Sequence, residues 1–106
     1  MLKITDKVYT IEELKAIVKP ILEKCPRVKA LYVYGNYAYG TARPNSPILC
    51  IIEGENLTVR DITMSEMADE LDEQLQKEVV IYQESELFYR RRMAIREERV
   101  PIYERS

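Results

Sequence analysis

The stretch that decides the fold is residues 28–52, which read VKALYVYGNYAYGTARPNSPILCII. Residues 28–34 are β-branched and aromatic, which is typical of a strand. The turn GNYAYG at residues 35–40 is expected to open a short helix. Residues 41–47 have the composition of a loop, and residues 48–52 form an apolar run of the kind that is buried on both faces of a sheet. The stretch therefore predicts two strands joined by a turn, a short helix and a loop.

A helix is predicted before the first strand. Thr10 and Glu13 have the spacing of a capping box, in which each side chain bonds the backbone N–H of the other residue. Apolar residues then recur at helical spacing as far as Leu22. Pro20 falls inside this pattern, so we expect the helix to be kinked or broken there.

The elements after residue 52 follow from the same signals. A second capping box begins at Thr63 and precedes a helix with an apolar stripe and an acidic opposite face. Residues 79–82 predict a third strand, and a last helix is predicted from Ser85 to near Glu98. Residues 100–103 are expected to form an extended tail. The order predicts one α/β (α+β) domain over residues 1–106, with a small mixed sheet of three to four strands flanked by helices.

Composition excludes several kinds of chemistry. The chain has 106 residues and no histidine, so a Ser-His-Asp triad, a Cys-His pair and an imidazole zinc site are all excluded. Cys25 and Cys50 are far apart, which favours a reduced intracellular protein. Residues 1–7 lack the apolar run of a signal peptide, and no run is long enough for a membrane span. We therefore expect a cytoplasmic protein that does not bind membranes.

Charge is segregated along the chain. Residues 1–52 carry eight basic and four acidic side chains, residues 53–86 carry two and eleven, and residues 87–106 carry six and three. A general nucleic-acid binder needs a continuous basic surface, which the acidic middle interrupts, so nucleic acid is not an expected partner. Solvated helix faces explain such a distribution, and a charged partner protein explains it too.

Residues 28–52 resemble the signature of the nucleotidyltransferase superfamily, the polymerase-β-like fold, and in particular its minimal nucleotidyltransferase proteins. In that signature an apolar strand ends in Gly-Ser, and Asp-x-Asp follows ten residues later on the next strand. Gly35 and Asn36 stand at the Gly-Ser position, and GNYAYG is similar to the family's Gly-Ser-Tyr-Ala-x-Gly. RVPIY at residues 99–103 is similar to the family's C-terminal Gly-Val-Pro-Leu-Tyr. The resemblance implies a nucleotidyltransferase-like fold.

The resemblance also implies three aspartates that hold Mg²⁺ ions, and all three are replaced. Two of them align with Pro47 and Leu49, and the third aligns with Val80. Two glutamates could be considered as substitutes. Glu53 shares the strand face of Leu49 but lies about 13 Å away, and Glu78 lies about 7 Å along the strand from Val80. One glutamate cannot rebuild a two-metal site, so we predict vestigial metal positions, no bound metal and no catalytic residue.

The turn after the first strand carries a separate prediction. In the family this turn approaches the nucleotide phosphates, and an asparagine amide can still donate to a phosphate oxygen. Gly35, Asn36 and Arg43 are therefore candidate phosphate contacts without a metal. The alternative is a plain turn in which the glycine satisfies backbone geometry, and this alternative is favoured.

Two further side-chain patterns bear on function. Arg92, Arg96 and Arg99 share one face of the last predicted helix, where a solvated face is the simpler interpretation than a phosphate or RNA site. Tyr32 and Tyr34 alternate on one strand face, and tyrosine suits a half-buried interface as well as ordinary packing.

Three hypotheses of function follow. The first is a catalytically inactive nucleotidyltransferase-fold protein that acts by protein binding without a cofactor. The resemblance implies that its partner would be a helical HEPN-domain protein, with this chain as the antitoxin-like member of the pair. The second is an enzyme that uses ATP and Mg²⁺ to transfer a nucleoside monophosphate to a protein hydroxyl, with an unconventional metal site. The third is a homodimer formed through edge strands.

Overall fold

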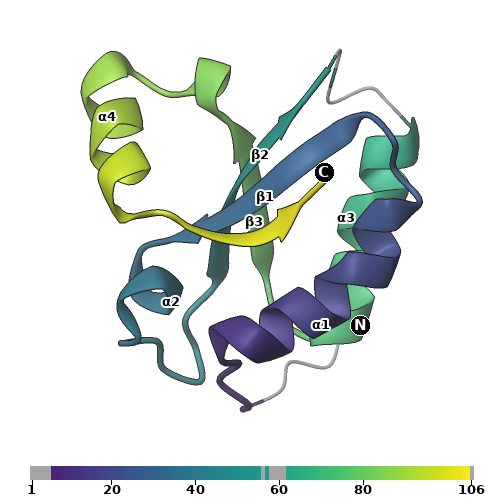
Figure 1. Ribbon diagram of the computed structural model, residues 1–106. Helices are drawn as coiled ribbons and strands as arrows, with labels where there is room; N and C mark the ends of the chain where they lie inside the picture. The colour runs from purple at the N-terminus through teal and green to yellow at the C-terminus, as the bar shows by residue number, and fades with distance from the viewer. Residues whose placement is uncertain (1–5, 56, 58–61, 106) are drawn as a thin grey trace.

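A computed structural model describes residues 6–55, 57 and 62–105 of the chain, except for the side chains of residues 62–64. Figure 1 shows the arrangement of the elements within these residues. In chain order the elements are α1 (Ile11–Glu23), β1 (Val28–Tyr34), α2 (Asn36–Tyr39), β2 (Ile48–Gly54), α3 (Ile62–Leu75), β3 (Val79–Gln83), the 3-10 helix η1 (Glu84–Glu86), α4 (Tyr89–Glu98) and β4 (Val100–Glu104).

The strands form a mixed four-stranded sheet in the order β3-β2-β1-β4, which confirms the predicted small mixed sheet. β1 is antiparallel to both β2 and β4, whereas β2 and β3 are parallel. The predicted extended tail is thus an edge strand, in which Tyr103 is the register partner of Leu31. Pro101 fits this position because an edge strand has one side that needs no N–H donor.

Helices cover both faces of the sheet (Figure 1). Successive residues of a strand point to opposite faces, and β2 divides its side chains accordingly. Cys50 belongs to the main core cluster, together with side chains of α1 and α3 such as Leu14 and Leu71. Ile51 belongs to a smaller cluster with Ile95 of α4. The apolar run in β2 is therefore buried between α1 and α3 on one face and α4 on the other.

α1 begins as predicted but is not interrupted. The Thr10 hydroxyl accepts from the N–H of Glu13, and the Glu13 carboxylate accepts from the N–H of Thr10, both at 3.1 Å. The prediction that Pro20 kinks or breaks the helix is wrong in its stronger form, because α1 continues through Pro20 to Glu23. Ala16, whose carbonyl would accept from residue 20, is exposed, so water can take the place of the missing N–H.

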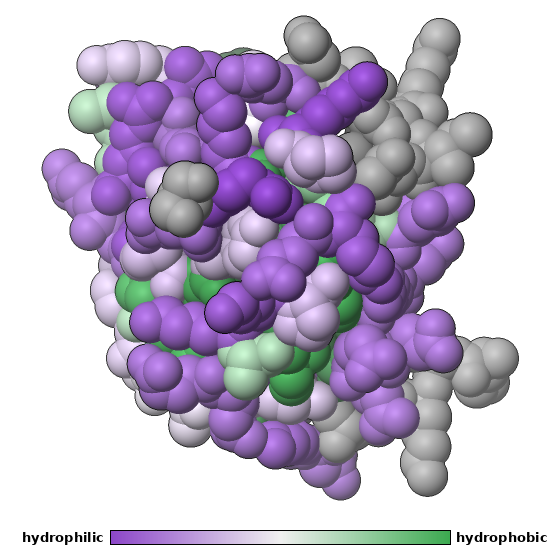
Figure 2. All heavy atoms as spheres, turned by 45° about the vertical axis from the view of Figure 1, so that its right-hand side comes forward, coloured by the Kyte–Doolittle hydropathy of each residue, from purple (hydrophilic) through white to green (hydrophobic). Residues whose placement is uncertain are grey.

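α3 places its apolar stripe on the core and its charged face in solvent. Met67, Leu71 and Leu75 are buried. The helix begins at Ile62, so Thr63 lies inside it rather than at the predicted cap position. Figure 2 shows that hydrophilic side chains cover most of the face that carries α1 and α3. None of the helices in the described part of the chain has the length and apolar character needed to cross a membrane.

The last helix begins later than predicted. Residues 84–86 form η1, Leu87 and Phe88 are extended, and α4 starts at Tyr89 rather than at Ser85. The side chain of Arg92 explains the break, because it donates to the backbone carbonyls of Glu84 at 3.1 Å and Leu87 at 3.2 Å. Those carbonyls are satisfied without a continuous helix.

Candidate functional site

The structure brings two of the three predicted metal positions side by side. Leu49 of β2 is the register partner of Val80 in the parallel strand β3. Leu49 is also the register partner of Tyr34, the last residue of β1. Register partners point to the same side of a sheet, so these side chains form a row across three strands. Pro47 stands two residues before Leu49, just outside β2.

This row has no chemistry for holding a cation. Mg²⁺ takes oxygen ligands, and the side chains of Pro47, Leu49 and Val80 offer none. Leu49 instead packs against the small cluster formed by Tyr34, Ile51 and Ile95. Among the described residues, no group of three or more Asp, Glu, Cys or His side chains is placed to hold a metal ion. The three side chains that the resemblance aligns with aspartates therefore offer no ligands for a two-metal site.

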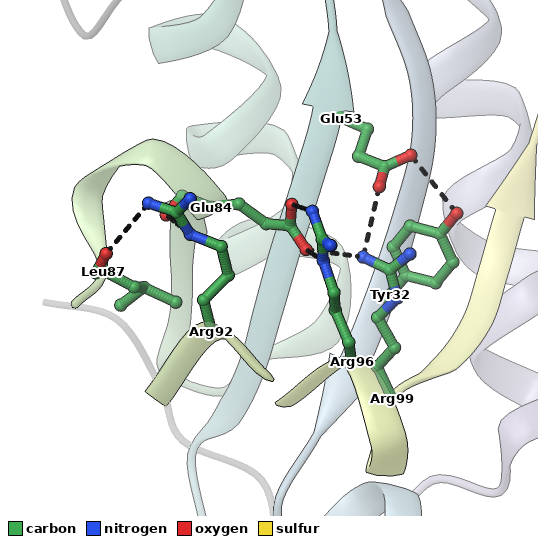
Figure 3. A network of polar contacts seen from close by, with 7 residues as sticks. All are labelled: Tyr32, Glu53, Glu84, Leu87, Arg92, Arg96 and Arg99. Atoms are coloured by element: carbon green, nitrogen blue, oxygen red, sulfur yellow. Dashed lines mark hydrogen bonds and ion pairs between the residues drawn. The ribbon is translucent and has the colours of Figure 1, made fainter. Parts of the chain in front are cut away.

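Carboxylates on the α4 side of the sheet are bound by arginines (Figure 3). The guanidinium of Arg99 donates to one oxygen of Glu53 and one oxygen of Glu84, both at 3.1 Å. Arg96 binds both oxygens of Glu84, at 2.8 and 2.7 Å, in the bidentate geometry that suits a guanidinium and a carboxylate. Glu53, the glutamate considered above as a metal ligand, is thus held by a cation of the chain itself.

Tyr32 completes this network from β1. Its hydroxyl donates to Glu53 at 3.3 Å, and the guanidinium carbon of Arg99 lies 3.9 Å from the centre of its ring. A guanidinium over an aromatic face is attracted to the ring's electron density. The prediction that Arg92, Arg96 and Arg99 share a face is confirmed, but that face is turned to Glu84 and the sheet rather than to solvent alone.

The network shifts two ionisation equilibria in opposite directions. The hydrogen bond from Arg96 lowers the pKa of Glu84, because the positive charge favours the carboxylate. Burial raises the pKa of the Tyr32 hydroxyl, and the negative charge of Glu53 raises it further. Near neutral pH these shifts keep Glu84 ionised and Tyr32 a neutral phenol.

The turn after β1 requires a glycine for two reasons. Gly35 has φ 71° and ψ −143°, in a region that side chains rarely allow. A Cβ atom at this position would also lie 3.3 Å from the Cδ1 atom of Leu49. Gly35 therefore sits directly over the row of apolar side chains, at the start of α2.

A carboxylate of the chain itself occupies this turn. The N–H of Gly35 donates to one oxygen of Glu98 at 3.3 Å, and the hydroxyl of Tyr39 donates to the other oxygen through a short hydrogen bond. That hydrogen bond raises the pKa of Tyr39 above its ordinary value. An N–H group that the resemblance assigns to a phosphate thus has an internal anionic acceptor.

The other two predicted phosphate contacts lie at the surface. Asn36 is exposed, and its side-chain oxygen accepts from the hydroxyl of Thr41 at 3.3 Å. Arg43 is exposed in the loop before β2, where its backbone N–H donates to the Ser46 hydroxyl at 3.0 Å. Phosphate binding by these residues stays a prediction.

Sequence reasoning missed Glu84 and Glu98 as parts of this region. Neither is a local neighbour of its partner, since Gly35 and Glu98 are 63 positions apart and Glu84 and Arg99 are 15 positions apart. The shared face of Arg92, Arg96 and Arg99 was a signal that a carboxylate should face it. It did not identify the carboxylate, because that depends on how α4 docks on the sheet.

The structure is similar to solved structures of known proteins. One is a toxin–antitoxin bound to AMP-PNP, with a TM-score of 0.70 and 18% identity over 87% of this chain and 74% of that chain. Another is a mutant of the toxin–antitoxin MntA–HpeT, with a TM-score of 0.67 and 16% identity over the same shares. A third is a protein named as a minimal nucleotidyltransferase, with a TM-score of 0.71 and 26% identity over 88% of this chain and 96% of that chain.

No protein-family model matches the sequence, and no curated protein matches it either. The similarity of this chain to known proteins is therefore shown by structure comparison. The chain has a nucleotidyltransferase-like fold of the minimal nucleotidyltransferase type, as the sequence resemblance predicted. Two of the solved structures that it resembles are of toxin–antitoxin proteins.

Proposed function

We propose that this chain is a catalytically silent nucleotidyltransferase-fold protein that acts by binding another protein. Its role would be that of the antitoxin-like member of a pair, and its partner would be a helical HEPN-domain protein. The observation that carries the proposal is the row formed by Leu49 and Val80, with Pro47 beside it. Apolar side chains stand at the positions that the resemblance assigns to the metal-binding aspartates, and they offer no oxygen ligand.

Two further observations support a site without catalytic activity. Glu53 and Glu84 are bound by Arg96 and Arg99, so neither carboxylate is available to a cation without breaking an ion pair. The carboxylate of Glu98 accepts a hydrogen bond from the N–H of Gly35, and a triphosphate would have to displace this carboxylate. The similar structures from toxin–antitoxin pairs support a protein partner.

Titration calorimetry with ATP and GTP, each with and without Mg²⁺, tests the silent site. We expect no binding that strengthens with Mg²⁺, because no described side chain at the row can coordinate the ion. Binding that strengthens with Mg²⁺ would contradict the proposal and favour the enzyme hypothesis. Metal-independent binding would mean that Gly35, Asn36 and Arg43 form a nucleotide site while the protein remains without catalysis.

Co-expression with the protein encoded beside this chain tests the binding function, because the resemblance implies that the two members of such a pair are often encoded side by side. We expect a stable complex on size-exclusion chromatography and no transfer of label from radioactive ATP to either protein. A complex without labelling supports protein binding as the activity. Labelling of the partner would show an active transferase, and the absence of any complex would contradict the proposed role.

A further inference from the structure

The start of α4 exposes two aromatic side chains that the described structure leaves largely uncovered, with a partly exposed methionine beside them. Phe88 is 89% exposed, Tyr89 is 71% exposed and Met93 is 39% exposed. Tyr89 and Met93 are four residues apart and lie on the same side of the helix. We refer to Phe88, Tyr89, Arg90, Arg91 and Met93 together as the aromatic knob. Adjacent exposed aromatic residues differ from singly scattered apolar ones, and they mark interaction sites.

Side-chain hydrogen bonds fix the backbone just before the aromatic knob. Arg92 points back to the carbonyls of Glu84 and Leu87, the two residues that bound the turn before the knob (Figure 3). The carboxylate of Glu84 is in turn fixed by Arg96 and Arg99. A segment that is ordered before binding loses little conformational entropy on binding. The network on the sheet therefore fixes the backbone from which Phe88 and Tyr89 project.

The charge of the knob indicates what can cover it. Arg90 and Arg91 are exposed and form no ion pair with any described residue, and Arg92 follows them. The first turn of α4 has no acidic residue to offset the positive end of the helix dipole. The aromatic side chains are thus flanked by the two positive charges of Arg90 and Arg91, which are complementary to a surface with carboxylates around an apolar pocket.

A second copy of the chain does not meet this requirement in a closed dimer. Two knobs facing each other would place arginines against arginines, which repel. The acidic face of α3 has the right charge, but α3 and α4 lie on opposite faces of the sheet (Figure 1). Contacts from the knob of one copy to α3 of the next would be head-to-tail, so they would form a ring or an open filament and not a closed dimer.

Nucleic acid is a poorer match than protein. Arginine and aromatic side chains can bind single-stranded nucleic acid through phosphates and stacked bases. Here two unpaired arginines border the aromatic side chains, and the whole chain has a net charge of −2. Met93 adds apolar surface that a protein pocket can bury. Tyr, Phe, Met and Arg are the residue types enriched at protein interfaces.

We propose that the aromatic knob is the surface on which the partner protein docks. The partner presents an apolar pocket for Phe88 and Tyr89, rimmed by carboxylates that pair with Arg90 and Arg91. This inference rests on the proposed function, since it assigns the protein-binding activity to one surface. Buried aromatic anchors contribute most of the binding energy at such interfaces, and the charged rim accelerates association.

The test uses the protein encoded beside this chain as the immobilised probe and measures binding kinetics for four forms of the chain. These are the native chain, Phe88→Ser/Tyr89→Ser, Arg90→Glu/Arg91→Glu, and the control Lys15→Glu/Lys19→Glu. The control makes the same change of charge on exposed residues of α1, on the other side of the sheet. All substituted residues are exposed, so each variant should unfold thermally near the native temperature.

We expect the aromatic variant to lose affinity by about 30-fold or more, mainly through faster dissociation. The arginine variant should associate more slowly and lose most of the salt dependence of association, whereas the control should bind like the native chain. A complex that forms equally well with all variants would overturn the assignment of the surface and leave the proposed function standing. No complex with the native chain would overturn both.

Two other outcomes also overturn the assignment. Sedimentation of the native chain alone could show a dimer that Phe88→Ser/Tyr89→Ser dissociates, and the knob would then belong to a second copy. A single-stranded RNA could bind the native chain and not Arg90→Glu/Arg91→Glu, and the knob would then be a nucleic-acid site. We expect neither dimer nor RNA binding.

Discussion

Glu98 determines what the turn at Gly35 can bind. Its carboxylate accepts from the Gly35 N–H at 3.3 Å and places a negative charge beside the predicted phosphate contacts. We expect Glu98→Ala to bind inorganic triphosphate at least about tenfold more tightly than the native chain does. The reason is that a hydrogen bond to a charged group contributes about 1.5–3 kcal/mol, and a like charge is removed as well. Titration calorimetry without added metal measures the difference.

Glu97→Ala is the matched control for that prediction. Glu97 is an exposed residue of the same helix, so its removal changes the net charge equally without changing the turn. Adding Arg43→Ala to Glu98→Ala should weaken the binding again if Arg43 contacts the phosphate. Equal affinities of the Glu98→Ala and Glu97→Ala proteins would mean that Gly35 is a plain turn, the alternative that the sequence favoured.

The buried hydroxyl of Tyr34 leads to a second prediction about a single side chain. Its hydroxyl is buried and has no hydrogen-bond partner among the described residues. An unsatisfied buried polar group costs about 1–3 kcal/mol, so Tyr34→Phe should raise the free energy of unfolding by about 1 kcal/mol. Tyr9→Phe is the control, because the Tyr9 hydroxyl donates to the carbonyl of Leu75 at 2.8 Å and its loss should destabilise the fold. Urea denaturation distinguishes the two, and a destabilised Tyr34→Phe protein would contradict this account.

Helix α4 is the element that was predicted least well from the sequence. Its periodicity places Arg92, Arg96 and Arg99 on one face, and that part of the prediction is confirmed. The predicted start at Ser85 is wrong because Arg92 satisfies backbone carbonyls that a longer helix would have used. Such a contact depends on a turn and a helix packing together on the sheet, so no local propensity contains it. β4 is a similar case, since its pairing with β1 cannot be read from residues 100–104 alone.

Docking of α4 on the sheet should depend on pH through Glu84. The hydrogen bond from Arg96 lowers the pKa of Glu84 in the folded state below its ordinary value of 4.5. A carboxyl group whose pKa is lower in the folded state stabilises the fold above its unfolded pKa. That stabilisation is lost as the pH falls through the folded pKa. We therefore expect the native chain to lose stability below about pH 4.5 and to keep this contribution at neutral pH.

Glu84→Gln isolates this contribution. The variant should be less stable than the native chain by about 1.5–3 kcal/mol at neutral pH, the range for hydrogen bonds to charged groups. The difference between the two proteins should shrink as the pH falls below about 4.5, because Glu84 is protonated first in the unfolded chain and, at lower pH, in the folded protein as well. Glu73→Gln, an exposed residue of α3, should show little difference at either pH. Chemical denaturation at several pH values provides the comparison, and a constant difference for Glu84→Gln would contradict the linkage.

At the scale of the whole molecule, local patterns and the resemblance together predicted the fold. A β-branched and aromatic run identified β1, a continuous apolar run identified β2, and a capping box identified the start of α1. The two-sided burial of β2 followed from its continuous apolar run. The ion pairs of Glu84 and the contact between Glu98 and Gly35 did not follow from any pattern. Those contacts join segments that meet only after the sheet and α4 have assembled, and they determine what the candidate site can do.

Burial at the centre of the sheet leads to a prediction for the whole molecule. Cys50 lies on β2 between β1 and β3 and is 1% exposed. Burial raises the pKa of its thiol to about 12, so the reactive thiolate is scarce in the folded state at pH 8. Central strands open only when the whole domain unfolds. Labelling of Cys50 by a thiol reagent should therefore require global unfolding.

The Cys25→Ser protein isolates Cys50 for this measurement. We expect the free energy of opening, obtained from the labelling rate of Cys50 at equilibrium, to equal the free energy of global unfolding of the same protein in urea. Cys25 is 5% exposed and lies just after α1, so in Cys50→Ser its thiol should be labelled at a lower free energy, through fraying of the helix end. If Cys50 were labelled well below the global value, β2 would open locally. The sheet would then be too mobile to hold Leu49 and Val80 as a fixed apolar row.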